Sequence, residues 1–208
     1  EGTSYLVYAP DGSHTPLQVG RDGKARFIGV VPSIGHKVFH VRPGVSDAPP
    51  VKASKQRMEN GLIKLSFDKQ GRLREVYDKR ADRDVLEPGA YGNRFVLYED
   101  KMASTGDAWD IDVFFNDKPI EFDGKLISMD VVEQGPVRAV LRIRRSISKS
   151  IISQDIIVTA GSARIDFETM VEWGDERDVL LKTAFPVRIH SERARYEVPF
   201  GSIERPTH

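Results

Sequence analysis

The sequence predicts an all-β protein built as an antiparallel β-sandwich. Three observations favour this class. Apolar and polar residues alternate with period two along several runs, turn-forming residues separate these runs, and no segment longer than about ten residues shows a helical period. The 31 basic and 31 acidic side chains cancel, which argues against a nucleic-acid-binding protein, because such a protein carries a basic surface.

Residues 1–45 are expected to form a small β-domain. Four short runs are typical of strands, and the turns Asp11-Gly12 and Asp22-Gly23 lie among them: YLVYA at 5–9, TPLQV at 15–19, KARFIGVV at 24–31 and GHKVFHV at 35–41. About 45 residues is too few for an independent hydrophobic core, so this domain must pack on a neighbour.

A linker is predicted at residues 46–57, in a stretch rich in Pro, Ser and charge that has no periodicity. Residues 58–208 are then the main sandwich, with turns expected at 68–71, 133–136 and 159–162. Three runs within it alternate most clearly, each predicting a half-buried antiparallel strand. Their apolar faces are Val137, Ala139, Leu141 and Ile143; Ile165, Phe167, Thr169, Val171 and Trp173; and Ala194, Tyr196, Val198 and Phe200.

The sequence offers no self-contained catalytic or metal site. His36 and His40 are four residues apart, but in an extended run they lie about 13 Å apart, which is too far to share one metal ion. The chain has no Cys, no nucleophile elbow and no phosphate-binding loop. The lack of Cys and of Asn-x-Ser/Thr acceptors favours a cytoplasmic location, and no apolar run is long enough to span a membrane.

The segment STGDAWDID at residues 104–112 is the most distinctive polar motif. Asp110 and Asp112 would share one face of an extended chain, with Cα atoms about 6.6 Å apart, and Asp107 precedes them. Paired carboxylates are what glycosidases use, and the ring of Trp109 could stack on a pyranose. The other interpretation is a solvated acidic loop in which Asp side chains cap turns.

Longer motifs carry a resemblance to a known family. YGNRFVLYEDKMASTGDAWDID, EQGPVRAVLRIRRSI and ARYEVPFGSIERPTH, in this order, resemble the β-rich C-terminal half of glycoside hydrolase family 38 α-mannosidases. The match is closest to the bacterial and cytosolic branch. The resemblance implies a galactose-mutarotase-like supersandwich that is truncated here and preceded by a small β-domain.

The resemblance also implies that these residues are an internal part of a larger zinc-dependent retaining enzyme that hydrolyses terminal α-mannosides. The family's zinc and nucleophile belong to an N-terminal catalytic barrel, so no cofactor is expected within these 208 residues. By the DAWD and RPTH matches, Asp107, Trp109, Asp110, Arg205 and His208 either contact the sugar or dock the sandwich on the barrel. The expected partners are the α-mannoside substrate, the barrel of the same polypeptide and, through exposed apolar surface, further copies of the chain.

Two other functions stay open at this point. The chain could be a free-standing carbohydrate-binding module that uses Trp109 as a stacking platform. A mutarotase-like epimerase is the third, but it needs a general acid and a general base across one sugar, and no His–Glu motif of that kind is present.

Overall fold

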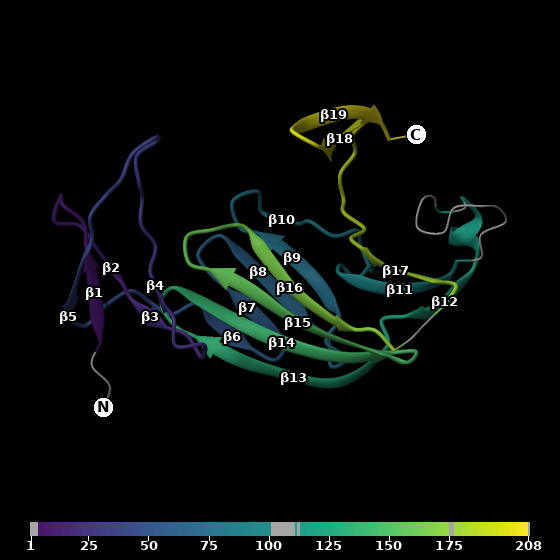
Figure 1. Ribbon diagram of the computed structural model, residues 1–208, viewed down its shortest axis with the longest axis horizontal. Coiled ribbons are helices and arrows are strands. Elements are labelled where there is room, and N and C mark those ends of the chain that lie inside the picture. Colours follow the sequence, from purple (N-terminus) through teal and green to yellow (C-terminus); the bar gives the residue numbers. More distant parts are fainter. Residues whose placement is uncertain (1–3, 101–110, 112, 175–176, 208) are drawn as a thin grey trace.

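The computed structural model describes residues 4–100, 111, 113–174 and 177–207, and it is built from antiparallel sheets (Figure 1). The predicted all-β fold is therefore confirmed. Among the described residues, no helix has the length and apolarity needed to cross a membrane.

Two facing sheets form the main sandwich. Their strand orders are β10–β9–β8–β7–β6 and β13–β14–β15–β16. The strands are β6 (Lys52–Ser54), β7 (Arg57–Glu59), β8 (Ile63–Phe67), β9 (Leu73–Asp78), β10 (Arg83–Asp84), β13 (Lys125–Gln134), β14 (Arg138–Ile147), β15 (Ser150–Thr159) and β16 (Ile165–Glu172). The predicted turns lie between β8 and β9, β13 and β14, and β15 and β16.

The core of the sandwich lies between these two sheets. It is built from alternate residues of each long strand, which is why the period-two pattern predicted it. Each fully buried Leu, Ile or Phe contributes roughly 1.5–3 kcal/mol. The buried residues are Val51, Met58, Ile63, Leu65, Phe67, Leu73, Leu86, Met129, Ala139, Leu141, Ile143, Ile156 and Val158.

A third sheet, in the order β12–β11–β17, extends the sandwich at one end. It consists of β11 (Arg94–Glu99), β12 (Pro119–Phe122) and β17 (Val179–Ala184), and the short 3-10 helix η1 (Val113–Asp117) precedes β12. Phe95 and Leu97 of β11 share a second core cluster with Ile147 and Ile152. The ends of β14 and β15 are thus covered by this sheet.

A tight turn at Asp123 and Gly124 joins β12 to β13. Both residues have positive φ, of 59° and 58°. A Cβ on Gly124 would lie 2.2 Å from the backbone oxygen of Ser146. Only glycine fits this approach, because the atom it would meet belongs to the backbone and cannot rotate away.

The small domain is less regular than predicted. It has a sheet in the order β2–β1–β5 and a separate pair β3–β4, which break the predicted strand 15–19 at Leu17. The strands are β1 (Tyr5–Tyr8), β2 (His14–Pro16), β3 (Gln18–Val19), β4 (Ala25–Arg26) and β5 (His40–Pro43).

The predicted strands at 24–31 and 35–41 are wrong for most of their length, because residues 27–39 form a projecting arm without strand pairing. At its base, the rings of Phe27 and Phe39 meet edge to face at 5.1 Å, and Gly29 lies close against both rings. Its outer part exposes apolar side chains, and Val30 is 78% exposed.

The predicted linker at residues 46–57 is not wholly irregular. Lys52–Ser54 forms β6, the edge strand of the five-stranded sheet, and Arg57 begins β7. Val51 is buried, and Ala53 packs against the main core. A three-residue strand beside a Pro-rich stretch is too short for its alternation to be recognised. The division into two domains stays a prediction.

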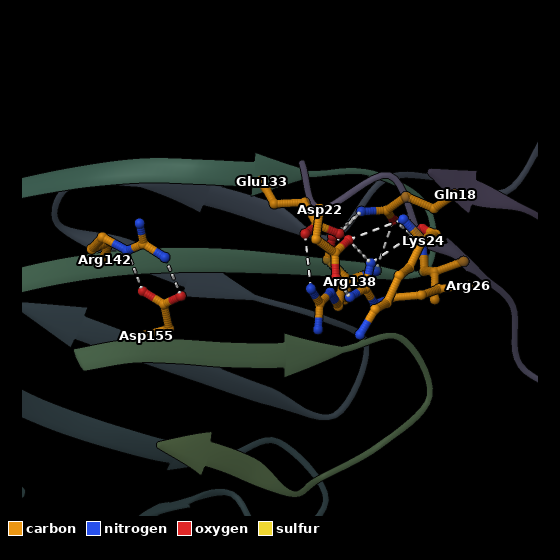
Figure 2. A network of polar contacts seen from close by, with 9 residues as sticks. Gln18, Asp22, Lys24, Arg26, Glu133, Arg138, Arg142 and Asp155 are labelled. Carbon is orange, nitrogen blue, oxygen red and sulfur yellow. Dashed lines mark hydrogen bonds and ion pairs between the residues drawn. The ribbon is translucent and has the colours of Figure 1, made fainter. Parts of the chain in front are cut away.

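The predicted small domain contacts the sandwich through the amide of Gln18 (Figure 2). Its Oε1 accepts hydrogen bonds from the backbone N–H groups of Val137 and Arg138, at 2.9 and 3.0 Å. Its Nε2 donates to Glu133 Oε1 at 2.7 Å and to the carbonyl of Arg138 at 3.1 Å. A Cβ on Gly135 would lie 2.5 Å from the Gln18 side chain, so the β13–β14 turn is shaped to receive this amide.

The ion pair of Glu133 with Arg138 at this contact should make the stability of the protein depend on pH. Two hydrogen bonds from the Arg138 guanidinium, at 3.0 and 2.9 Å, lower the pKa of Glu133 below its ordinary value of 4.5, although burial opposes them. A carboxylate with a lowered pKa contributes stability above its unfolded pKa, which is lost as the pH falls through the folded value. We expect the free energy of unfolding of wild type to exceed that of Glu133→Gln at pH 7, and the difference to shrink as the pH falls below the ordinary value of 4.5 toward the lowered folded pKa. A constant difference in urea melts from pH 7 to pH 3 would contradict this.

Candidate functional site

The strands β18 (Arg193–Val198) and β19 (Gly201–Pro206) form a hairpin that carries Arg205. No other described strand pairs with it, and Figure 1 shows it standing apart from the sandwich. A two-stranded hairpin is marginally stable by itself in water. The hairpin is therefore expected to rest on another surface in its working state.

Arg205 lies opposite Ala194 and on the same hairpin face as the pair Tyr196 and Ile203. Its side chain is exposed and has no hydrogen bond or ion pair to the described residues. The other face carries Arg195, whose Nη2 is 2.8 Å from Glu204 Oε1. The hairpin thus has one apolar face bearing a cation and one face of paired charges.

The hairpin apex is also exposed. Phe200 has φ 60° and is fully exposed, at the turn between β18 and β19. The prediction that placed Phe200 in a strand is wrong. Pro199 and Gly201, which lie on either side of Phe200, are typical of a turn and could have indicated its position from sequence.

Backbone hydrogen bonds fix the segment that leads to the hairpin. Glu87 N donates to Pro186 O at 3.0 Å, and Arg188 N donates to Val85 O at 2.7 Å. At its base, Thr207 N donates to Glu192 O at 3.1 Å. The starting point of the hairpin is therefore set by the sandwich.

The other predicted site residues, Asp107, Trp109, Asp110 and His208, lie outside the described residues. Within 104–112 the structure describes only Ile111; β11 precedes this segment in the chain and η1 follows it. In η1 the ring of Phe115 lies 5.2 Å from that of Tyr98, and Lys182 Nζ lies 4.1 Å from the Phe115 ring centre. Whether this loop meets Arg205 stays a prediction.

An open groove of about 610 Å³ crosses the outer face of β14, β15 and β16. Its side chains are charged or polar apart from one Met, and the guanidinium of Arg142 holds the carboxylate of Asp155 by two bonds of 2.7 Å (Figure 2). None of the residues that line this groove is aromatic, so it lacks a platform for sugar stacking. They are Arg142, Arg144, Ser153, Asp155, Glu168, Thr169, Met170 and Glu172.

Metal ligands are not gathered in the part of the chain that the structure describes, since no group of three His, Asp or Glu side chains lies close enough to hold an ion. The described residues therefore do not fit a zinc site. Gln18, Glu133 and Arg138, which position the small domain, were missed from sequence, since nothing in the sequence pairs residues so far apart.

The chain was compared with known proteins. The family model described as "Glycosyl hydrolases family 38 C-terminal domain" matches residues 58–208. Alpha-mannosidase G of Dictyostelium discoideum is 36% identical over 159 residues, which is 73% of this chain and 14% of that protein. Human alpha-mannosidase 2C1 is 33% identical over 152 residues, again 73% of this chain and 14% of that protein.

The alpha-mannosidase of Saccharomyces cerevisiae is 33% identical over 168 residues, which cover 73% of this chain and 15% of that protein. The chain thus spans about a seventh of the length of these relatives. The match to the bacterial or cytosolic branch stays a prediction. The family model covers most of the chain, including nearly all of the sandwich. The chain therefore belongs to glycosyl hydrolase family 38, and its residues 58–208 match the C-terminal domain of that family.

Proposed function

We propose that this chain is the non-catalytic β-rich portion of a zinc-dependent, retaining α-mannosidase that hydrolyses terminal α-mannosides. In that enzyme it braces the catalytic domain and lines part of the sugar site. The family match and the α-mannosidase names of the relatives support the enzyme class. The observation that carries the role of this portion is the hairpin β18–β19, which presents Arg205 on a face that no described strand covers.

Arg205 has chemistry that suits this position. A guanidinium is always charged and presents five N–H donors in a rigid fork. It can donate to sugar hydroxyls or hold a carboxylate of the catalytic domain by two bonds. Tyr196 and Ile203 beside it supply apolar surface that would become buried on docking. In this proposal the rest of the polypeptide supplies the zinc site and the nucleophile, as the family resemblance implies.

The first test compares the 208-residue chain with a longer polypeptide that includes the catalytic domain. We expect the longer protein to hydrolyse an aryl α-mannoside and the 208-residue chain to show no turnover above blank, with or without added zinc, because loop carboxylates alone form no preorganised site. Zinc-dependent turnover by the 208-residue chain would overturn the proposal. Saturable mannoside binding by that chain alone would favour the carbohydrate-binding module instead.

The second test concerns Arg205 in the longer protein. We expect Arg205→Met to lower kcat/KM by about tenfold to a hundredfold, because a hydrogen bond from a charged donor contributes about 1.5–3 kcal/mol. The zinc content is expected to stay unchanged. The matched control is Arg195→Met, which removes a cation from the opposite face of the same strand pair and disturbs only an exposed ion pair. A lowered melting temperature with wild-type kinetics would reassign Arg205 to docking alone.

A further inference from the structure

We propose that Asn60 is a site of irreversible deamidation that folding protects, and that the modified chain can no longer close this end of the sandwich. Asn60-Gly61 is the only Asn-Gly pair in the sequence. Because glycine has no Cβ, its backbone nitrogen is unhindered and can attack the side-chain amide carbon of the preceding asparagine. Such a modification limits how long an unfolded chain stays able to refold.

The reaction needs only water as a co-reactant. The Gly61 nitrogen forms a bond to Cγ of Asn60, and its proton passes to the Nδ2 group, which leaves as ammonia. Water then opens the resulting succinimide at either carbonyl carbon and gives aspartate or isoaspartate, with no transfer of electrons. In both products a carboxylate replaces the amide, so the site gains a negative charge and loses two N–H donors.

In the folded protein the Asn60 amide has every hydrogen-bonding position filled. Its Oδ1 accepts from the backbone N–H groups of Leu62 and Ile63, at 2.8 and 2.9 Å. Its Nδ2 donates to the carbonyls of Thr159 and Ser162, both at 2.7 Å. An amide offers two acceptor and two donor positions. Succinimide formation removes Nδ2 and redirects Oδ1, so it breaks these bonds and requires the site to open first.

The two bonds from Nδ2 cross from one sheet to the other. Asn60 lies in the turn between β7 and β8, whereas Thr159 ends β15 and Ser162 lies in the turn that follows. The bonds thus join the facing sheets at one end of the sandwich, where Ala160 packs against the main core. Opening this end costs free energy, so few folded molecules expose the amide to attack at any time.

A carboxylate cannot replace the amide at this position. The carbonyl oxygens of Thr159 and Ser162 accept hydrogen bonds and donate none, so each 2.7 Å contact would set one acceptor against another. The Asn60 side chain is only 9% exposed, and water therefore does not take the place of the lost donors. A buried charge that faces two acceptors costs far more than the lost hydrogen bonds contributed.

Charged neighbours do not remove this cost. The charged side chains that line the same pocket, among the described residues, are Lys52, Glu59 and Lys79. Lys79 Nζ already donates to the backbone carbonyl of Asn60 at 2.7 Å and holds the carboxylate of Glu59. Lys52 is exposed, and the facing turn at 159–162 contains no charged residue.

Peptide mass spectrometry measures the modification. Trypsin cleaves after Arg57 and Lys64 and releases a peptide in which Asn60 is the only side-chain amide. We expect its conversion to the acid to be about a hundredfold faster when the longer polypeptide is incubated in urea than in buffer alone. Asn93, which the larger Arg94 follows, is the internal control and should convert more slowly in urea. Equal rates at Asn60 with and without urea would overturn the proposed protection.

Refolding measures the consequence. We expect wild type kept in urea to lose its refolding yield as the modified fraction rises, with the modified molecules in the part that does not refold. Gly61→Ala is the matched variant, because a methyl group hinders the attack while nothing lies within 4 Å of the added Cβ. It should form the acid about tenfold more slowly in urea and keep its refolding yield. Modified wild-type molecules that refold completely would overturn the proposal, as would an equal loss of yield in Gly61→Ala.

Asn60→Asp reproduces one product in a uniform sample. An uncharged carboxyl can donate to one of the two carbonyls, whereas a carboxylate cannot, so the folded variant binds a proton more readily than the unfolded chain. Its stability therefore falls as the pH rises. We expect its urea midpoint to lie below that of wild type at pH 7 and to approach it on acidification. A midpoint equal to that of wild type at pH 7, or a difference that does not change with pH, would contradict the proposal.

Discussion

Gly124→Ala is expected to lower the free energy of unfolding by about 3–4 kcal/mol. The new methyl would meet the Ser146 carbonyl oxygen at 2.2 Å and its carbon at 3.0 Å, and φ is 58° there. Because the obstacle is backbone within the β14–β15 hairpin, relief requires the β12–β13 turn to move. That movement would disturb the neighbouring contact in which Arg145 donates to the carbonyl of Asp123. Urea denaturation monitored by circular dichroism measures the loss.

Two other glycines separate the causes of this effect. Gly12→Ala tests positive φ alone, since φ is 83° and nothing lies within 4 Å of the added Cβ. Gly61→Ala tests neither cause, because its surroundings are equally open and its φ is not positive. We expect the free energy of unfolding to fall by about 1 kcal/mol in Gly12→Ala and to stay almost unchanged in Gly61→Ala. A loss at Gly124 no larger than that at Gly12 would show that the close approach costs nothing.

Gln18→Ala is expected to lower the free energy of unfolding by about 2–4 kcal/mol. The variant removes all four hydrogen bonds of the amide and leaves the buried N–H of Val137 and a carboxylate oxygen of Glu133 without this partner. A buried donor left without a partner costs more than the hydrogen bond itself contributed. We also expect faster proteolysis between residues 44 and 50, because the small domain would detach from the sandwich.

The matched control is Gln70→Ala, in the exposed β8–β9 turn, where the interactions of the turn are made by Asp68 and by the Gln70 backbone. It should leave both the denaturation midpoint and the rate of proteolysis unchanged. Equal effects of the two substitutions would mean that Gln18 does not hold the junction.

The sequence predicts the sandwich well because its long strands bury one face only. Leu141 and Ile143 alternate with arginines. The alternation is visible in the sequence because the polar face of the strand is exposed to solvent and the apolar face packs in the core. The small domain lacks this contrast. Residues 27–31 are apolar without polar alternation, a pattern that predicts a buried strand. In the structure these residues belong to an exposed arm.

The candidate site is less predictable for a different reason. The motif that contains Arg205 was identified by resemblance, whereas its exposed position on an unpaired hairpin follows from tertiary structure. Gln18 was not identified, because its partners Glu133 and Arg138 are brought to it by folding. Whether Asp107, Trp109 and Asp110 contact sugar stays a prediction that rests on the motif alone.

The separation of Gln18 from Glu133 along the chain bears on the order of folding. The two residues are 115 positions apart, so a long loop must close before the amide finds its partners, and loop closure opposes early contacts of this kind. The β13–β14 turn that receives Gln18 consists of neighbouring residues and can form beforehand. Docking of the small domain is then a late event, after the folding barrier. Substitutions at Gln18 should consequently accelerate unfolding and leave the folding rate almost unaltered, so that this contact governs the lifetime of the folded protein.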